Sequence, residues 1–574
     1  MPENKNANAR DFWQGIVFLM LFLFGVFLTG PLHSLILIKI NDGVKSYETL
    51  TSPSAGSWPE FIDNRDPSAG LVTLNFFLYN VTNPAEVLVG GRPLLAEVGP
   101  LRYTYVNTKH NWSWANDGEE LIFWQYQRFL AADDATRTLE GVVITQLNTL
   151  LAGALAQGSY DGFLPFLEDL LQNPDGGALI NRTAKEILWG YVDKALVGLA
   201  SWPGLIHNDT SLESMLASHG HVRIATGKSD GSQSMNYLEW GGRPELVCCV
   251  NGVAGEDAGA SDSGGCAPQF SSYDATTIQG SYGAAFHSGI AIDETLKIAT
   301  YDFGIYRHWP MQCLPRGSAE GSNAPGAAWL YDASPLTASI GACDSYTIHD
   351  VSLLRFRLPT WVLGNESVAE AVTHGETAGY GIDGASGILD MTSCYHGPKV
   401  LLSKARFLDA SSQLPNALDG IGVANFKDHG SWVGVEPVTG RVLDLRFRIG
   451  INAVFAETNI TGFFNTQWTF FKGVTRNVIP LGYASLESTM TVDQASAFRS
   501  KVYTPIYILV ALRWSGAGFV VVGFFCLGVV SIRFFLRSAR RIVHNELREE
   551  MGGGVYHGII NQDQDIDANP FGVN

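Results

Sequence analysis

Basic residues are scarce in this chain, which has 38 Lys and Arg against 56 Asp and Glu and a net charge of −18. This acidic balance argues against nucleic acid as a partner, because binding a phosphate backbone requires positive charge. It also argues against attachment to anionic lipid through bulk charge. No Pro- or Ser-rich linker divides the chain, so the glycine-rich stretches 252–265 and 317–328 are interpreted as surface loops within one domain.

The signatures of common catalytic sites are missing. The sequence contains no G-x-x-x-x-G-K-[ST] and no H-E-x-x-H motif. It also lacks the C-x-x-C and H-x-x-x-H spacings of metal sites. We therefore expect neither an enzyme nor a bound metal or cofactor. The 13 histidines are scattered; structural or loop positions are expected, with acid sensing as the alternative, for His287, His308, His349 and His396.

The clearest feature that is present is an uncharged apolar run over 514–532, bracketed by Arg513 and Arg533. A helix rises about 1.5 Å per residue, so a run of this length matches a hydrocarbon core of roughly 30 Å. Further arginines follow the run, and retained positive charge marks the cytosolic side of a span. The sequence predicts a transmembrane helix with its flanks over 504–536 and a cytosolic tail over 537–574. A buried core helix is the alternative.

A second apolar run covers 15–38 and is uncharged apart from His33. It is long enough to cross a bilayer with some tilt. A cleaved signal peptide is the alternative, but Thr29-Gly30-Pro31 offers no A-x-A-like cleavage site. With two spans and a cytosolic C-terminus, the N-terminal tail over 1–14 is also cytosolic. The residues between the spans, 39–503, then form an exoplasmic ectodomain.

Glycosylation acceptors and cysteines agree with this topology. All the N-x-[ST] acceptors lie between the spans, namely Asn80, Asn111, Asn181, Asn208, Asn365 and Asn459. Among the 7 cysteines, Cys526 lies in the second span. The others are disulfide candidates with fifteen alternative pairings: Cys248, Cys249, Cys266, Cys313, Cys343 and Cys394.

The ectodomain begins with strand patterns, and the period then changes. Aromatic and β-branched residues favour strands over 71–81, 93–105 with a break at Gly99-Pro100, 120–129 and 137–144. An amphipathic helical stripe follows at Phe163, Phe166, Leu167, Leu170 and Leu171. Thr183 and Glu186 have the spacing of a capping box that opens a further helix. We predict a helical insert over about 145–215 within a β-rich body.

Several blocks of sequence resemble the class B scavenger receptor family, which includes the fatty-acid translocase and a lysosomal integral membrane protein. The most specific are RTAKEILWGYVDKAL and GILDMTSCYHGPKVLLSKARFLDA; the full set covers 76–88, 98–105, 182–196, 224–231, 353–359, 387–410 and 434–440. The resemblance implies an α+β, membrane-anchored protein, with an antiparallel β-barrel-like ectodomain, a helical-bundle apex and two flanking transmembrane helices. It also implies a hydrophobic tunnel that runs toward the bilayer.

The chain departs from the family pattern in three places. Tyr306 precedes Arg307 where the family often has a cysteine, so the usual disulfide set does not carry over whole, and the partner of Cys394 stays open. The apex residues 151–180 include acidic side chains and no Lys, Arg or His, which disfavours recognition of anionic particles by charge. Both tails lack the cysteines that are often palmitoylated in the family.

Two functions fit these observations. In the first, the protein binds a lipid or lipoprotein ligand at the apex, at the helical stripe of 163–171, and passes lipid through the tunnel to the membrane. In the second, the apex helices grip a protein cargo or adhesion partner, which the tail then sorts. The stripe also fits simple core packing of the helices. A continuous apolar cavity is the feature that separates lipid transfer from cargo binding.

The C-terminal tail carries two candidate sorting signals. Tyr556 and Ile559 fit Y-x-x-Φ, the form read by clathrin adaptors, and Asn569-Pro570-Phe571 resembles the motif bound by EH-domain proteins. Together they predict cycling between the plasma membrane and endosomal or lysosomal membranes. The alternative is a tail whose motifs no protein recognises. Self-association of the chain into a homo-oligomer stays open.

Overall fold

The computed structural model describes residues 3–51, 72–149, 151, 177–192, 201–202, 205, 221–241, 247–249, 266–268, 278, 280–300, 307–313, 343–363, 386–390, 400–456, 458–461, 467–470 and 477–550. These residues belong to two compact units. The first unit combines the chain up to Asp42 with the chain from Ser500 onward, and the second is Gly43–Arg499.

The first unit consists of long helices. Its elements are α1 (Glu3–Phe27), a π-helical turn (Leu28–Leu32), the start of α2 (His33–Glu48), and α15 (Thr504–Glu550), which follows a second π-helical turn (Arg499–Tyr503). Pro31 lies in the first π-helical turn, where the wider turn accommodates its missing N–H group. Ala9–Asp42 and Val492–Leu547 are long and apolar enough to cross a membrane, in agreement with the two predicted spans.

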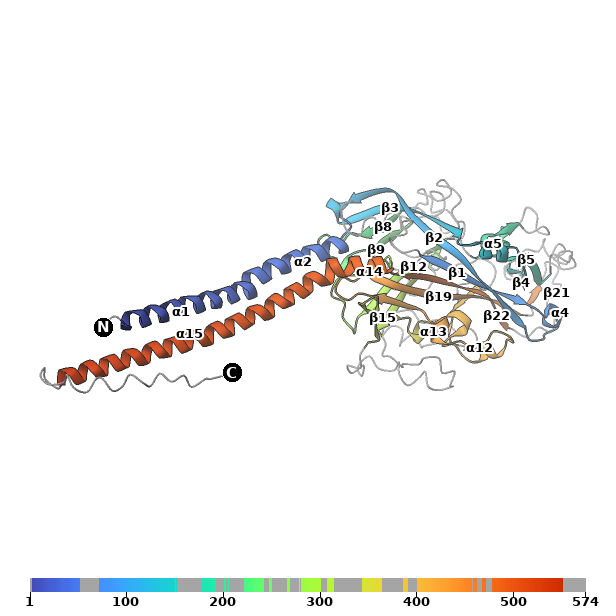
Figure 1. The fold of residues 1–574 in the computed structure, drawn as a ribbon. Helices are drawn as coiled ribbons and strands as arrows, with labels where there is room; N and C mark the ends of the chain where they lie inside the picture. The colour runs from blue at the N-terminus through green and yellow to red at the C-terminus, as the bar shows by residue number, and fades with distance from the viewer. Residues whose placement is uncertain are drawn as a thin grey trace. The chain divides into compact units, whose positions relative to one another are not determined.

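Glycines bring α1 and α15 close together in an antiparallel pair (Figure 1). A Cβ atom on Gly25 would lie 2.7 Å from the Gly516 carbonyl oxygen, and one on Gly523 would lie 2.9 Å from the backbone of Phe22. In lipid, small residues stabilise helix pairs because they let the backbones approach closely. The pair therefore has no room for a side chain at these glycines.

The second unit is built on one large antiparallel sheet (Figure 1). The order of its main path is β12-β13-β15-β18-β19-β22-β1-β2-β3-β8-β9, with β14, β16 and β17 paired beside it. The strands are β1 (Thr73–Val81), β2 (Leu95–Ala115), β3 (Glu120–Ala131), β8 (Val222–Ala225), β9 (Tyr237–Trp240), β12 (Thr295–Thr300), β13 (Arg307–Cys313), β14 (Ser345–Ile348), β15 (Val351–Arg357), β16 (Ile388–Asp390), β17 (Val400–Ser403), β18 (Trp432–Val435), β19 (Val442–Phe455) and β22 (Asn477–Thr489).

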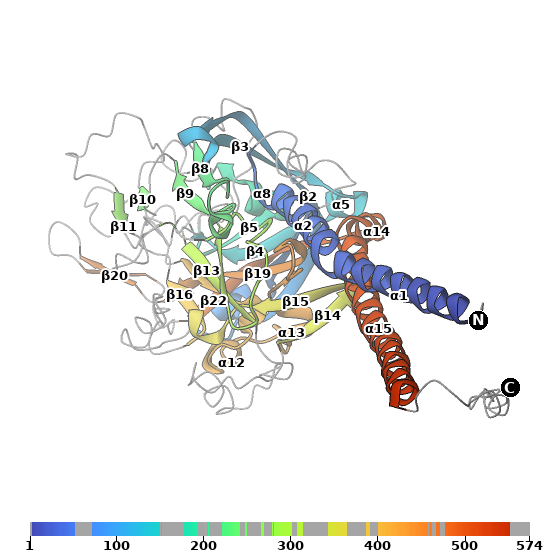
Figure 2. The same cartoon turned by 90° about the vertical axis from the view of Figure 1, so that its left-hand side faces the viewer.

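Ser281 joins the two edges of this sheet. It forms isolated bridges to Asn236, beside β9, and to Ile298 of β12. Figure 2 shows β8, β9 and β13 in one view of the sheet. Its N–H donates to the Lys297 carbonyl at 2.8 Å, and its carbonyl accepts from the Ala299 N–H at 3.0 Å. The sheet is therefore nearly closed into a barrel, which confirms the predicted architecture, and closure removes the unpaired edges that invite aggregation.

Short elements decorate the barrel. Among the described residues, four two-stranded units are formed by β4 (Val143–Leu147) with β5 (Leu179–Thr183), β6 (Tyr191–Val192) with β7 (Ser201–Trp202), β10 (Val247–Cys249) with β11 (Cys266–Pro268), and β20 (Thr458–Thr461) with β21 (Gln467–Phe470). The short helices are α4 (Pro84–Val87), α5 (Asp134–Glu140), α8 (Ala184–Trp189), α12 (Gln413–Asn416), α13 (Phe426–His429) and α14 (Val492–Phe498). Single 3₁₀ turns are formed by Asn116–Gly118, Gly231–Gln233, Thr360–Leu363 and Ala405–Phe407.

Two local predictions are wrong. The strand expected over 137–144 begins only at Val143, because Asp133 caps α5 by accepting the Thr136 N–H at 2.7 Å. The expected break at Gly99-Pro100 does not divide β2, which runs through it while its pairing with β1 shifts register between Phe76 and Leu78.

The predicted helical insert is described only in part. Within about 145–215, the β4–β5 and β6–β7 pairs surround α8, and the remainder lies outside the described residues. The capping box of α8 is confirmed: Thr183 Oγ1 accepts from the Glu186 N–H at 3.2 Å, and Glu186 Oε2 accepts from the Thr183 N–H at 2.8 Å.

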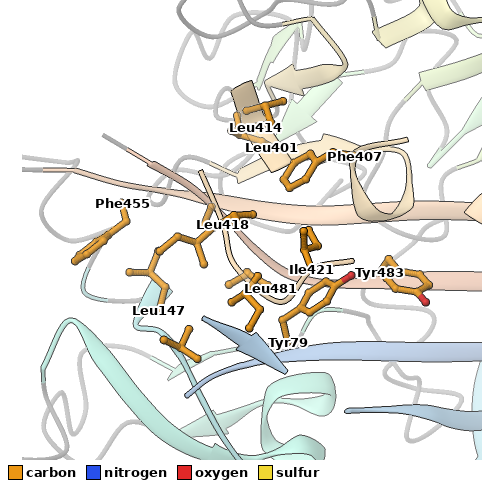
Figure 3. Packing of buried hydrophobic residues seen from close by; sticks show 14 of the residues in the cluster. Tyr79, Leu147, Leu401, Phe407, Leu414, Leu418, Ile421, Phe455, Leu481 and Tyr483 are labelled. Atoms are coloured by element: carbon orange, nitrogen blue, oxygen red, sulfur yellow. The ribbon is translucent and has the colours of Figure 1, made fainter. Parts of the chain in front are cut away.

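One hydrophobic cluster covers the face of the sheet that carries Tyr79 and Tyr483 (Figure 3). The segment between β17 and β18 supplies Phe407, Leu414, Leu418 and Ile421 to this cluster. These side chains pack on residues of β1, β17, β19 and β22, including Leu401, Phe455 and Leu481. This cluster packs the segment between β17 and β18 onto the sheet.

Candidate functional site

The rings of Trp309 and Phe447 meet across the sheet. They lie on β13 and β19, and their centroids are 5.6 Å apart. β15 and β18 separate these strands, and neighbouring strands lie about 4.8 Å apart, so a flat sheet would hold the two backbones about 14 Å apart. The rings make contact because the sheet curves toward this face. This face is therefore the inside of the barrel.

The inside of the barrel is lined by two hydrophobic clusters, and Leu486 of β22 contacts both. We call them together the inner apolar wall. Its almost fully buried members include Trp309, Met311, Phe356, Val433 and Val435 on one side and Leu74, Phe76, Leu78, Leu101 and Tyr103 on the other. Each such side chain stabilises the fold by about 1.5–3 kcal/mol. The wall is continuous from β13 round to β3 and presents carbon rather than charge.

Helix α8 packs against one part of this wall. Its last residue, Trp189, has ring centroids 4.9 Å from Tyr103 and 5.4 Å from Phe129, and its Nε1–H donates to Tyr103 Oη at 3.3 Å. Burial raises the pKa of Tyr103 well above its usual value, so the phenol stays neutral. Tyr103 in turn donates to Glu140 at 2.8 Å. These aromatic contacts therefore pack α8 against β2 and β3.

Polar side chains interrupt the apolar lining along β2 and β3. On β2, Asn107 and Lys109 continue the series of every-second residues that begins with Tyr103 and Tyr105. On β3, Gln125 and Gln127 lie between Phe123 and Phe129 in the corresponding series. The register pairs Asn107 with Gln127 and Lys109 with Gln125. All four are buried, with exposures of 3%, 7%, 1% and 2% respectively. We call these four residues, with Tyr282, the inner polar band.

Tyr282 connects the inner polar band to the segment that closes the barrel. Its hydroxyl accepts from Asn107 Nδ2 at 2.9 Å and donates to Gln125 Oε1 at 3.3 Å. The Lys109 ammonium lies 4.6 Å from the centroid of the Tyr282 ring, within range of a cation–π interaction. Asn107 Nδ2 also donates to Tyr105 Oη at 2.8 Å. The band is a hydrogen-bonded unit with a cation inside the barrel.

Sequence reasoning did not find the inner polar band. Along an alternating strand, polar positions are normally assigned to solvent, and inward and outward polar residues look alike in a single sequence. One signal was available. Tyr103 and Tyr105 lie at every second position with Asn107 and Lys109, so all four side chains are expected on the same face of the strand.

The predicted ligand stripe, Phe163, Phe166, Leu167, Leu170 and Leu171, lies outside the described residues, as do the sorting residues Tyr556, Ile559, Asn569, Pro570 and Phe571. The glycosylation acceptors Asn208 and Asn365 lie outside them as well. Asn111 and Asn181 are exposed, whereas Asn80 is half-buried in β1 and accepts from the Thr145 N–H at 2.8 Å. Asn459 lies in β20.

The predicted cysteines are only partly described. Cys313, at the end of β13, forms a disulfide with Cys343. Cys249 and Cys266 are register partners in the β10–β11 pair, which also holds Cys248. Cys394 lies outside the described residues, and Cys526 is a free thiol in α15. Within the described part of the chain, His, Cys, Asp and Glu form no group of three or more that could hold a metal ion.

Comparison with known proteins bears directly on this architecture. The sequence model of the CD36 family matches residues 16–315 and 339–533, which is most of the chain. The chain belongs to the CD36 family. This confirms the resemblance to class B scavenger receptors.

Two relatives illustrate the range of the CD36 family that this chain resembles. It is 23% identical over 462 residues to lysosome membrane protein 2 of Rattus norvegicus, covering 77% of this chain and 81% of that protein. It is 24% identical over 373 residues to scavenger receptor class B member 1 of Mus musculus, covering 64% and 62%. These relatives and the two candidate spans fit a two-span membrane protein.

Proposed function

We propose that this CD36-family protein is a receptor that binds a lipid or lipoprotein ligand and passes lipid through the barrel to the membrane. The observation that carries the proposal is the concave inner face of the nearly closed barrel, which the inner apolar wall lines. An apolar ligand in water costs about 25 cal/mol per Å² of exposed surface, which a route inside the barrel would avoid. The protein is not proposed to be an enzyme, and it needs no cofactor for this role.

The proposed topology places both termini in the cytosol and the barrel on the exoplasmic side. The exposed acceptors Asn111 and Asn181 would then carry glycans, as would the other predicted acceptors. Glycosidase treatment of the full chain should shift its mass by several glycans. A protein whose mass does not change contradicts this topology.

Lipid transfer can be tested with two neighbouring positions of β3. Ala131 packs against the inner apolar wall, whereas Leu130 points the other way and is 46% exposed. Ala131→Trp should slow transfer of a fluorescent lipid into acceptor vesicles, and Leu130→Trp should not. Surface delivery and glycosylation of both variants report whether they fold. Wild-type protein that carries no extractable lipid and transfers none would instead favour a cargo or adhesion receptor.

Traffic is proposed to depend on the tail, through a clathrin adaptor at Tyr556 and Ile559 and an EH-domain protein at Asn569, Pro570 and Phe571. Two weak sites on one short segment of chain can act together, because binding at one raises the effective concentration at the other. The double variant Tyr556→Ala with Phe571→Ala should accumulate at the plasma membrane. Normal internalisation of this variant would exclude these residues as the signal.

A further inference from the structure

We propose that arginines at the end of the second span bind the head groups of anionic phospholipids in the cytosolic leaflet. The residues are Arg533, Arg537 and Arg540 of α15, which we call the arginine stripe. This site goes beyond the proposed function, because it concerns the membrane anchor and not the ligand of the barrel. It uses the proposed topology only to assign the leaflet.

The arginine stripe follows one side of a continuous helix. α15 continues as a helix well beyond the apolar run 514–532. Arg537 comes about one turn after Arg533, and Arg540 comes seven residues, or about two turns, after Arg533. At about 1.5 Å of rise per residue, the three arginines span about 10 Å along the helix axis. All three side chains are exposed, so they form a short column of positive charge on the helix surface.

Aromatic residues place the arginine stripe at the surface of the bilayer. Arg537 forms an ion pair with Asp11 of α1, and Asp11 is buried. The next two residues, Phe12 and Trp13, are exposed, and their ring centroids are 6.1 Å apart. Exposed aromatic residues at the end of a span are typical of the boundary between lipid and water. Because the ion pair joins Asp11 to Arg537, the stripe lies at the level of the phospholipid head groups.

The opposite side of this part of α15 is apolar. Phe535 and Ile542 are also seven residues apart, and both are exposed. Each follows an arginine of the stripe, Arg533 or Arg540, by two residues, which is about 200° around the helix. A helix with cations on one side and exposed apolar side chains on the other is characteristic of the lipid–water interface. This pattern indicates that the helix beyond the apolar run remains in contact with lipid.

The protein does not neutralise the arginine stripe. Asp11 pairs with Arg537, but within the described part of the chain neither Arg533 nor Arg540 forms an ion pair. Between positions 533 and 547, the only acidic residue in the sequence is Glu546. Guanidinium groups bind phosphate oxygens in bidentate pairs, and basic clusters beside a span attract anionic lipids. The net charge of the whole chain, −18, therefore does not describe this surface.

The competing explanation is that these arginines only set the orientation of the span during insertion. The two explanations differ in what they predict for the finished protein. Orientation alone requires no preference among lipids. A head-group site requires a preference for anionic over zwitterionic lipids, and this preference should weaken at high salt because salt screens exposed charges.

The experiment compares photoactivatable phosphatidylserine with photoactivatable phosphatidylcholine of the same acyl chains, in nanodiscs that contain the full chain. The measured quantity is the ratio of their cross-linking yields to the part of α15 after Ile532. Wild-type protein should favour phosphatidylserine, and less so at high salt. Arg533→Gln with Arg540→Gln should lower the ratio about 5- to 25-fold, because each arginine near the surface contributes a factor of about 5. Arg533→Lys with Arg540→Lys should retain the preference.

A matched control removes the same charge from the other ends of the spans. Lys39 and Arg513 are exposed and flank the two apolar runs there, so Lys39→Gln with Arg513→Gln should leave the ratio almost unchanged. An equal loss in this control would assign the effect to total charge and overturn the inference. Surface delivery of each variant reports whether it is inserted.

Two further results would overturn the inference. One is equal cross-linking of the two lipids to wild-type protein, and the other is a ratio that the double glutamine variant leaves unchanged. If that variant fails to insert, the wild-type ratio and its salt dependence decide. Nanodiscs offer the same lipids in both leaflets, so cross-linking tests the site even if glycosidase treatment contradicts the proposed topology.

Discussion

Arg357 donates to Asp344 at 2.6 Å, and their side chains are only 4% and 3% exposed. Arg355 donates to the same carboxylate oxygen at 2.9 Å. Both guanidinium groups also stack on rings, Arg355 on Tyr346 at 4.1 Å and Arg357 on Phe426 at 4.3 Å. One buried carboxylate thus holds two arginines of β15 on the outer face of the barrel.

Removing this carboxylate should be costly. Asp344→Ala leaves Arg357 buried without its partner, and breaking a buried ion pair typically costs about 3–5 kcal/mol. The unfolding midpoint, followed by tryptophan fluorescence, should fall accordingly. Asp134→Ala is the control, because its ion pair with Arg137 is largely exposed and should leave the midpoint almost unchanged. Equal effects of the two substitutions would show that the buried pair adds nothing.

The disulfide between Cys313 and Cys343 should also contribute to stability. It closes a loop across 30 residues of sequence, for which the chain-entropy relation gives about 3–4 kcal/mol. Replacing both cysteines by serine should lower the denaturant midpoint and increase sensitivity to protease. Cys526→Ser, which removes a free thiol in α15, is the control. A double variant as stable as wild type would exclude this contribution.

The α1–α15 pair offers a test with glycines two residues apart. A Cβ on Gly516 would lie 2.6 Å from Thr29 Cγ2, whereas Gly518 has no neighbour within 4 Å. Gly516→Leu should separate the helices in the membrane, and Gly518→Leu should leave them packed. Cross-linking yield between cysteines placed at Gly15 and Val530, in a Cys526→Ser background, measures this. Unchanged yield in Gly516→Leu would show that the pair does not depend on close packing there.

Stability should fall at acidic pH partly because of His429. Burial, and then the charge of Arg406, hold the pKa of His429 below its usual value. The unfolded chain therefore binds more protons than the folded one once the pH falls through about 6.5, and stability declines with it. His429→Gln should flatten the change in unfolding midpoint between about pH 7.5 and about pH 5. The exposed His349→Asn should not; identical slopes for all three proteins would reject this assignment.

Features encoded by local chemistry could be predicted from the sequence. The two apolar runs, the capping box at Thr183 and the strand over 120–129 depend on neighbouring residues, and the structure contains all of them. Features that depend on distant partners could not. Ser281 closes the barrel through strands that precede and follow it, and nothing in its own surroundings indicates this.

The error over 137–144 has the same origin. A single side chain, Asp133, decided between strand and helix by capping the first turn of α5, and a short apolar-polar run does not distinguish the two. Which face of a strand lies inside the barrel also depends on distant residues. Lys109 is buried because the sheet as a whole curves toward its side. Composition could not assign a buried lysine to such a place.

The pairing of β1 with β22 determines how late in synthesis the barrel can be completed. Thr73 Oγ1 donates to the Glu487 carbonyl across 414 residues, so β1 is translated long before its neighbour exists. At about 5–20 residues per second, the delay is about 20–80 s. During that time β1 can pair with β2 on one side only, and its other edge is open to wrong partners. The barrel can be completed only when the strand preceding the last helix has been made, so its assembly must be one of the final events of synthesis.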